Sequence, residues 1–254
     1  MSNKADLQGR TIVFTGQPKS NDALLEVERL GGESKVFPLI RTQEITSQDD
    51  SFIAKLGTYD WLIFTSQNAV SAFVQKLWRH DVRMEAIQCK VAAVGSKTAD
   101  ALRSAGLKVV FTPTTYSADV FVQQFPQALK PSETCLFIKG TLAKATITNG
   151  ISQHVEDWTV YETLPNVENA KELSSYIQQQ ANAIIAFASP SAVDVFAREV
   201  APIISWDKLK TAAIGHVTAA ALEKNGAKVH VQPETYTWLA LVQQIAKWKD
   251  DSLK

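Results

Sequence analysis

The feature that most constrains this sequence is an internal duplication. Residues 91–116 align without gaps with residues 211–236, 120 positions further along, and 13 of the 26 aligned positions are identical. Unrelated sequences of ordinary composition would share about two or three. Two shorter pairs of segments repeat as well: 64–70 with 187–193, and more faintly 11–14 with 134–137. Repeats of this kind indicate two copies of one supersecondary pattern in a single chain.

Each copy alternates short apolar runs with stretches of helical periodicity. The apolar runs are bounded by small or polar residues, as fully buried parallel strands are. We expect strands at Trp61–Phe64, Val91–Val94, Ile184–Ala188 and Ala212–Ile214. Apolar residues three and four positions apart follow these runs, for example Ala69, Phe73 and Leu77. Strand–helix–strand order of this kind predicts an α/β fold, with parallel sheets and helices on both faces.

Length and composition limit the classes of function. A chain of 254 residues allows one large domain or two of ordinary size. The 26 basic and 26 acidic residues cancel, which argues against the broad positive surface of a nucleic-acid binder. Cys89, Cys135 and the four histidines lack the spacing of metal ligands. With a polar N-terminus and no long apolar run, we expect a cytoplasmic protein that binds neither nucleic acid nor membrane and holds no metal.

Candidate site residues cluster at four predicted strand-to-helix turns. In open α/β sheets, ligands bind beyond the carboxyl ends of the strands, where the free amides of a helix start point toward the crevice. The residues at these turns are Thr65, Ser66, Asn68, Gly95, Thr98, Ser189, Ser191, Gly215 and Thr218. Hydroxyls beside free amides suit carboxylates, without a Lys or Arg for each one.

A purely structural interpretation of the same residues stays open. Ser66 and Ser189 are good helix N-caps, and Pro190 stands where a first helical residue should be. Gly95 and Gly215 fit tight turns whether or not a ligand approaches. The turns therefore gain functional meaning only as a set. Phosphate-loop, dinucleotide-binding and nucleophile-elbow motifs are absent from the sequence.

Five segments carry a resemblance to a known family. They are Phe64–Val70, Ala92–Ala99, Val160–Thr163, Ala188–Val193 and Ala213–Thr218. Together they resemble the uroporphyrinogen-III synthase family, in order and at suitable spacing from about residue 10 to residue 245. Each segment is weak by itself, and the five in order are much more specific.

The resemblance implies two flavodoxin-like α/β domains joined by a two-stranded linker. One domain would be discontinuous, because the chain crosses between the domains twice. Carried over, the bounds are 1–35 with 166–254 for the first domain, 41–158 for the second, and 36–40 with 159–165 for the linker. The duplication alone would suggest a single cut near residue 125.

The resemblance also implies a reaction, that of a cyclising lyase in heme biosynthesis. The family's substrate is hydroxymethylbilane, a linear tetrapyrrole with eight carboxylates, which is closed with inversion of ring D and loss of water to give uroporphyrinogen III. The resemblance further implies no cofactor, a monomer, and delivery of the substrate by hydroxymethylbilane synthase. Tyr161, in the matching Val-Tyr motif, would be the proton donor, since a phenol is uncharged at pH 7. Lys210 joins the expected substrate-binding residues.

The chain departs from the family in two places, which keeps other functions open. Gly16-Gln17-Pro18 stands where the family often has Arg-Pro, and Lys139 and Lys144 stand where it often has arginines. Lysine does not replace a bidentate guanidinium fully. The first alternative is a non-catalytic paralogue that binds a tetrapyrrole or another polyanion. A nucleotide or sugar binder is the second, and the missing phosphate loop disfavours it.

Overall fold

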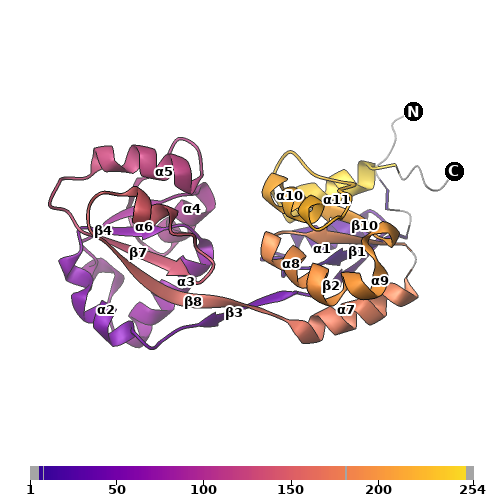
Figure 1. Cartoon of the computed structure of the whole chain (residues 1–254), viewed down its shortest axis with the longest axis horizontal. Coiled ribbons are helices and arrows are strands. Elements are labelled where there is room, and N and C mark those ends of the chain that lie inside the picture. The colour runs from indigo at the N-terminus through magenta and orange to yellow at the C-terminus, as the bar shows by residue number, and fades with distance from the viewer. Residues whose placement is uncertain (1–5, 8, 181, 250–254) are drawn as a thin grey trace. The chain divides into compact units, whose positions relative to one another are not determined.

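The chain divides into two compact units, each an α/β structure. A computed structural model describes residues 6–7, 9–180 and 182–249 (Figure 1). The described parts of Met1–Arg41 and Leu164–Lys254 form unit 1, and Thr42–Thr163 forms unit 2. Each unit holds a largely parallel sheet with helices packed on both faces. The predicted α/β class with parallel sheets is confirmed.

Unit 1 contains a four-stranded sheet in the order β10-β9-β1-β2. The strands are β1 (Thr11–Phe14), β2 (Glu33–Val36), β9 (Ala183–Phe187) and β10 (Lys210–Ala213), and all neighbours are parallel. One face packs against α7 (Val167–Gln179), α8 (Pro190–Glu199), α9 (Ala201–Ile204) and α10 (His216–Lys224). The other face packs against α1 (Asp22–Arg29) and α11 (Trp238–Lys247). Consecutive strand residues alternate between the two cores.

Unit 2 contains most of a six-stranded sheet in the order β3-β8-β7-β4-β5-β6, and residues 40–41 of β3 and 164–165 of β8 belong to unit 1. Its strands are β3 (Ile40–Glu44), β4 (Trp61–Phe64), β5 (Lys90–Ala93), β6 (Val109–Phe111), β7 (Cys135–Gly140) and β8 (Val155–Pro165). One face packs against α2 (Asp49–Lys55), α3 (Gln67–Arg79) and α4 (Ser96–Ser104). On the other face lie α5 (Ala118–Gln124), α6 (Thr146–Gly150) and the 3-10 helix η3 (Phe125–Ala128). Short 3-10 helices also occur at Leu56–Thr58 (η1), Met84–Ala86 (η2) and Trp206–Lys208 (η4).

The duplication in the sequence is a duplication of the sheet. Unit 1 has the order β10-β9-β1-β2, and unit 2 contains the matching run β5-β4-β7-β8. The segments that repeat in sequence lie in equivalent elements: β4 with β9, β5 with β10, and β7 with β1. Gly106 and Gly226, at matching positions after α4 and α10, both have positive φ (89° and 81°), as expected for glycines that end helices.

One predicted strand is wrong. The resemblance implied a linker strand over 36–40, but β2 ends at Val36 and β3 begins only at Ile40. Pro38 lies between them, and proline has no amide hydrogen to donate to a sheet ladder. The stretch 159–165 lies within β8, as expected. The domain bounds 1–35 with 166–254, and 41–158, stay a prediction.

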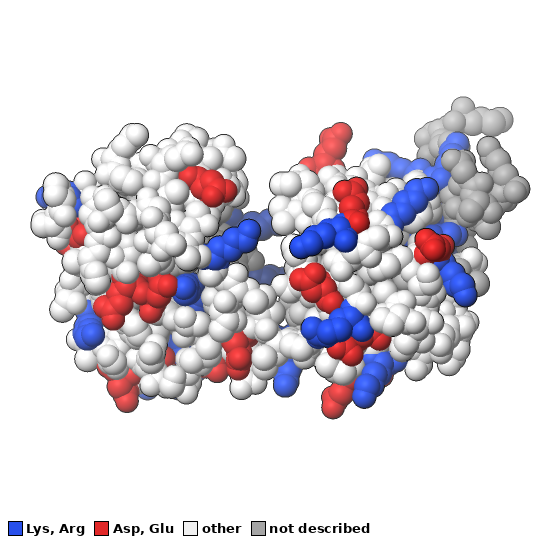
Figure 2. All heavy atoms as spheres, in the orientation of Figure 1, with Lys and Arg blue, Asp and Glu red and all other residues white. Residues whose placement is uncertain are grey.

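Charged side chains show no single dominant sign. Figure 2 shows Lys and Arg interspersed with Asp and Glu on the face drawn, in line with a formal net charge of zero. Among the described residues, every helix is too short or too polar to cross a bilayer.

Candidate functional site

The strand order of unit 2 locates a natural crevice. The chain continues from β4 to β5 on one side of β4, and from β7 to β8 on the opposite side of β7. Neighbouring strands whose connections diverge in this way mark a topological switch point, where open α/β sheets bind ligands beyond the carboxyl ends of the strands. Ser66 follows β4 at this point, and Gly140 ends β7. Tyr161 of β8 lies in register with Gly140.

Tyr161 and Ser66 are in direct contact at this switch point. The phenol oxygen of Tyr161 lies 3.1 Å from Oγ of Ser66. Ser66 is also the N-cap of α3, because its Oγ accepts a hydrogen bond of 3.1 Å from the amide of Ala69. A hydroxyl has one hydrogen and two acceptor positions. Ser66 can therefore donate its hydrogen to the Tyr161 oxygen, which leaves the phenol hydrogen for a ligand.

The ring of Tyr161 rests on the backbone of β7. A Cβ at Gly140 would overlap the ring of Tyr161, so only glycine at this position lets the ring lie flat against the strand. The amide of Thr141 donates to the backbone oxygen of Tyr161 at 3.1 Å. Ring and backbone of Tyr161 are thus both fixed by the end of β7. This support is what a precisely placed proton donor needs.

A pocket of about 310 Å³ opens beside Tyr161. Its lining residues are Thr42, Gln43, Glu44, Asn68, Ser71, Ala72, Gln75 and Tyr161, all in unit 2. Most of these side chains are polar and neutral, and each can donate or accept a hydrogen bond. Sequence reasoning found Asn68 and Tyr161 but missed the others. The signal for Ser71 and Gln75 was their spacing of three and seven residues from Asn68, which places all three on one face of α3.

The residues expected at the other helix starts differ in how far their side chains are exposed to solvent. Gly95 and Gly215 are the N-caps of α4 and α10. Thr98 and Thr218, three residues further, are only 4% and 3% exposed. Both side chains are therefore nearly closed off from solvent. Among the residues expected at these turns, the hydroxyl side chains with more access are Thr65, Ser66, Ser189 and Ser191, all of intermediate exposure.

Unit 1 has a switch point of its own, between β1 and β9. Ser189 follows β9 there and caps α8 by accepting a hydrogen bond from the amide of Ala192 at 3.3 Å. Thr15, directly after β1, binds back to the sheet, because its amide and its hydroxyl both donate to the oxygen of Ala186, at 3.0 and 2.9 Å. The capping interpretation of Ser66 and Ser189 is confirmed, and at Ser66 the same hydroxyl also contacts Tyr161.

Neither of two lysines considered from the sequence is available at these turns. Lys210 lies away from them, and Lys139 is in an ion pair. Lys210 is the first residue of β10, so it lies at the amino end of a parallel strand, whereas the helix starts lie at carboxyl ends. The structure does not bring Lys210 together with the other expected residues. Lys139 forms an ion pair with Asp157, whose other oxygen accepts from Thr148 at 2.6 Å. Among the described residues, no three His, Cys, Asp or Glu side chains group as metal ligands.

Comparisons with known proteins point to one family. The model of the family described as uroporphyrinogen-III synthase HemD matches residues 22–243. The uroporphyrinogen-III synthase of Chlorobaculum parvum is 28% identical over 246 residues, covering 94% of this chain and 98% of the relative. That of Synechococcus elongatus is 26% identical over 208 residues, covering 78% and 79%. A crystal structure of a mutant uroporphyrinogen III synthase from Thermus thermophilus shares the fold, with a TM-score of 0.70, 18% identity and coverage of 94% and 98%.

Proposed function

Because the chain belongs to the uroporphyrinogen-III synthase family, we propose that it closes hydroxymethylbilane into uroporphyrinogen III. The reaction inverts ring D and releases water, and the enzyme is a cyclising lyase of heme biosynthesis. The observation that carries the proposal within this chain is the Tyr161–Ser66 contact at the switch point of unit 2, beside a polar pocket.

Tyr161 is the proposed proton donor. Loss of the terminal hydroxyl as water needs one proton, and the adjacent pyrrole supplies the electron pair that expels it. The phenol of Tyr161 gives this proton while Ser66 hydrogen-bonds the oxygen that becomes negative. A neutral acid suits a substrate with eight carboxylates, because an ionised Asp or Glu in contact with it would repel it. Tyr161 regains its proton from solvent through the open pocket.

The helix starts are the proposed carboxylate-binding elements. Backbone amides at a helix start donate to anions without a counter-charge from a side chain. We propose that Thr65, Ser66, Asn68, Gly95, Ser189, Ser191 and Gly215 contact substrate carboxylates. Thr98 and Thr218 are buried, so we propose that they stabilise the positions of α4 and α10. Lys210 is left out, because it lies at the amino end of β10.

The wider setting is also proposed from the sequence. We propose a cytoplasmic monomer that takes hydroxymethylbilane directly from hydroxymethylbilane synthase. The proposed division is into domains 1–35 with 166–254, and 41–158. A gel-filtration run at several protein concentrations tests the monomer, since a dimer would shift toward earlier elution as concentration rises.

A coupled assay tests the function. Purified protein is mixed with hydroxymethylbilane synthase and its substrate in buffer with a chelator and no added cofactor. The porphyrin isomers are then separated by chromatography after oxidation. We expect the type III isomer. If the type I isomer, which forms spontaneously, is the sole product, the proposed synthase activity is overturned. If such a chain still bound uroporphyrin III tightly, it would be the tetrapyrrole-binding paralogue, which the pairing of Lys139 with Asp157 slightly favours.

A further inference from the structure

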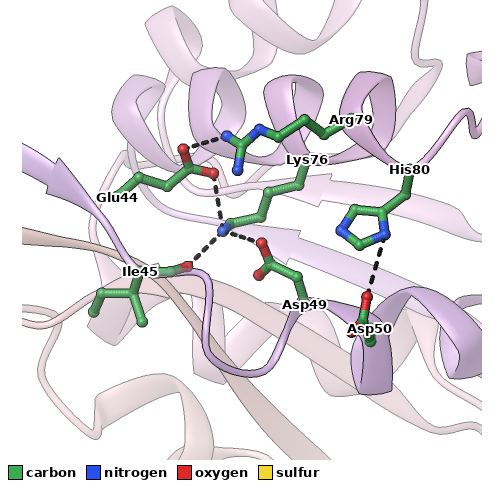
Figure 3. A network of polar contacts seen from close by, with 7 residues as sticks. All are labelled: Glu44, Ile45, Asp49, Asp50, Lys76, Arg79 and His80. Carbon is green, nitrogen blue, oxygen red and sulfur yellow. Dashed lines mark hydrogen bonds and ion pairs between the residues drawn. The ribbon is translucent and has the colours of Figure 1, made fainter.

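A cluster of charges around one buried lysine lies at the edge of the unit 2 sheet (Figure 3). We call it the Lys76 cluster: Lys76 and Arg79 of α3, Glu44 of β3, and Asp49 of α2. The ammonium of Lys76 is fully buried and donates to Oδ2 of Asp49 at 2.8 Å and to the backbone oxygen of Ile45. It also lies 3.0 Å from Oε1 of Glu44. Arg79 hydrogen-bonds the other oxygen of Glu44.

Glu44 belongs to two structures at once. It is part of the Lys76 cluster, and it also lines the pocket that contains Tyr161. Of the eight residues that line this pocket, Glu44 alone carries a charge. Burial raises the pKa of its carboxyl, but the hydrogen bonds from Arg79 and Lys76 outweigh burial and hold the pKa below its usual value. Glu44 is therefore an anion in the pocket wall at neutral pH.

An unpaired carboxylate here would oppose an anionic substrate. Two unit charges several ångströms apart at the edge of a protein repel one another by an amount that changes binding several-fold. In the Lys76 cluster, two cations face two carboxylates, and each oxygen of Glu44 lies against a cation, Oε1 against Lys76 and Oε2 against Arg79. Arg79 is the outer cation, with 40% of its side chain exposed, while Lys76 is shared with Asp49.

We propose that Arg79, with Lys76 behind it, is a positioning residue that holds the Glu44 carboxylate in an ion pair and offsets its charge, so that a carboxylate-bearing substrate can enter beside Tyr161. The inference rests on the proposed function, because it needs an anionic substrate. Arg79 contacts Glu44 and is not among the residues that line the pocket.

The competing explanation is purely structural. The Lys76 cluster ties β3 and α2 to α3, and removing one partner of a buried ion pair is strongly destabilising whatever binds nearby. Lys76 is unsuitable for the test for this reason. Arg79 is better, because its ion pair is partly exposed and contributes little to stability. If the role is only structural, loss of Arg79 changes the melting temperature, and KM for the substrate stays unchanged.

A double-mutant cycle at Arg79 and Glu44 separates the two explanations. The variants are Arg79→Gln, Glu44→Gln and the double variant, with Arg103→Gln as a control. Arg103 also forms an exposed ion pair on a helix of unit 2, with Asp100, but does not line the pocket. KM, kcat and melting temperature are measured for each in the coupled assay.

We expect Arg79→Gln to raise KM about 3- to 10-fold with kcat within about twofold. Glu44→Gln should leave KM equal to or below that of the wild type, and the double variant should return to within about twofold of it. Arg103→Gln should change nothing.

An unchanged KM in Arg79→Gln, or a raised KM that Glu44→Gln fails to rescue, overturns the inference while the proposed function stands. If Arg79→Gln does not fold, a raised KM in Glu44→Gln overturns it. A wild type that makes only the type I isomer overturns the proposed function and the inference with it.

Discussion

The phenol oxygen of Tyr161 lies 3.1 Å from Oγ of Ser66, and that same Oγ caps α3. One serine hydroxyl therefore supports both the fold and the candidate site. It joins the start of α3, which follows β4, to Tyr161 on β8. Substitutions at the two positions should consequently have different signatures: one affects chemistry alone, and the other affects stability and chemistry together.

Replacing Tyr161 by Phe should slow turnover by about 10- to 1,000-fold, the range for loss of one positioned proton donor. The ring that packs against Gly140 is retained, so the melting temperature should stay within a few degrees of that of the wild type. The rate is measured with saturating hydroxymethylbilane. Wild-type turnover in this variant would show that Tyr161 is a packed linker aromatic and that another group protonates the departing hydroxyl.

Replacing Ser66 by Ala should reduce both stability and turnover. Loss of the N-cap should cost about 0.5–2 kcal/mol of unfolding free energy, and loss of the contact with Tyr161 should slow the reaction. Ser117→Ala is the matched control, because Ser117 caps α5 of the same unit by accepting from the amide of Val120 at 3.2 Å. Both variants should lose similar stability in urea unfolding. Equal turnover in the two variants would argue that the Ser66–Tyr161 contact has no part in catalysis.

Thr98→Val and Thr218→Val test how the helix starts act. Because both threonines are at least 96% buried, we expect the loss of each hydroxyl to lower the melting temperature while KM changes by less than about threefold. The alternative is direct carboxylate binding by the hydroxyls. It predicts weaker substrate binding by about 1–3 kcal/mol at an unchanged melting temperature. Measuring both quantities on the same preparations distinguishes the two.

Glu133 should make unit 2 sensitive to acid. Hydrogen bonds from Lys90, from the indole of Trp61 and from the amide of Lys130 outweigh burial and lower the pKa of Glu133 from 4.5 to about 2. A lowered folded-state pKa stabilises the fold above the unfolded-state value, and this stability is lost as pH falls from about 4.5 toward 2.

Glu133→Gln should therefore reduce the free energy of unfolding by about 1–3 kcal/mol at pH 7, and the difference from the wild type should shrink as pH falls through this window. Urea unfolding at several pH values between 7 and 2.5 provides the measurement. Glu85→Gln, which removes an exposed carboxylate in the same unit, should leave the pH profile unchanged. Parallel profiles for Glu133→Gln and the wild type would exclude this role.

The fold was largely predictable because its signals are local. The predicted strand Trp61–Phe64 coincides with β4. The strands predicted for β5 and β9 are displaced by one residue, and the strand predicted for β10 starts two residues late and ends one residue late. These strands are buried on both faces, so their apolar runs are unambiguous. The break between β2 and β3, where the resemblance implied one strand over 36–40, also has a local cause, because Pro38 has no amide hydrogen to donate to a sheet ladder.

The candidate site was only partly predictable because its contacts are distant in sequence. Ser66 and Tyr161 are 95 residues apart, and Glu44 is 35 residues from Arg79. A carboxylate in a pocket wall cannot be recognised from sequence when its cations come from another element. Lys210 is different, because it precedes the predicted strand Ala212–Ile214, and its place at the amino end of β10 therefore follows from the sequence.

The two copies of the duplication differ in what surrounds one equivalent pair of glycines, Gly95 and Gly215. The ring of Tyr236 covers Gly215, and a Cβ at Gly215 would lie 2.9 Å from Cγ of that ring. His216 fixes the far end of the ring, because its Nδ1 lies 2.9 Å from the Tyr236 hydroxyl. The equivalent Gly95 has no neighbour within 4 Å of such a Cβ, and Tyr116 is 61% exposed.

This difference predicts opposite tolerance to alanine at equivalent positions. Gly95 has φ −120° and Gly215 has φ −171°, and both conformations are open to any residue, so only the contact with Tyr236 distinguishes the sites. Gly215→Ala should cost about 1–3 kcal/mol of unfolding free energy through overpacking, and Gly95→Ala should change it by less than about 0.5 kcal/mol. In a Tyr236→Ala background, the cost at Gly215 should disappear. Because Gly95→Ala leaves the fold intact, a raised KM in that variant alone would mean that the substrate approaches this turn closely. Equal destabilisation by the two alanines in urea unfolding would show instead that the turns themselves, and not the Tyr236 ring, require glycine.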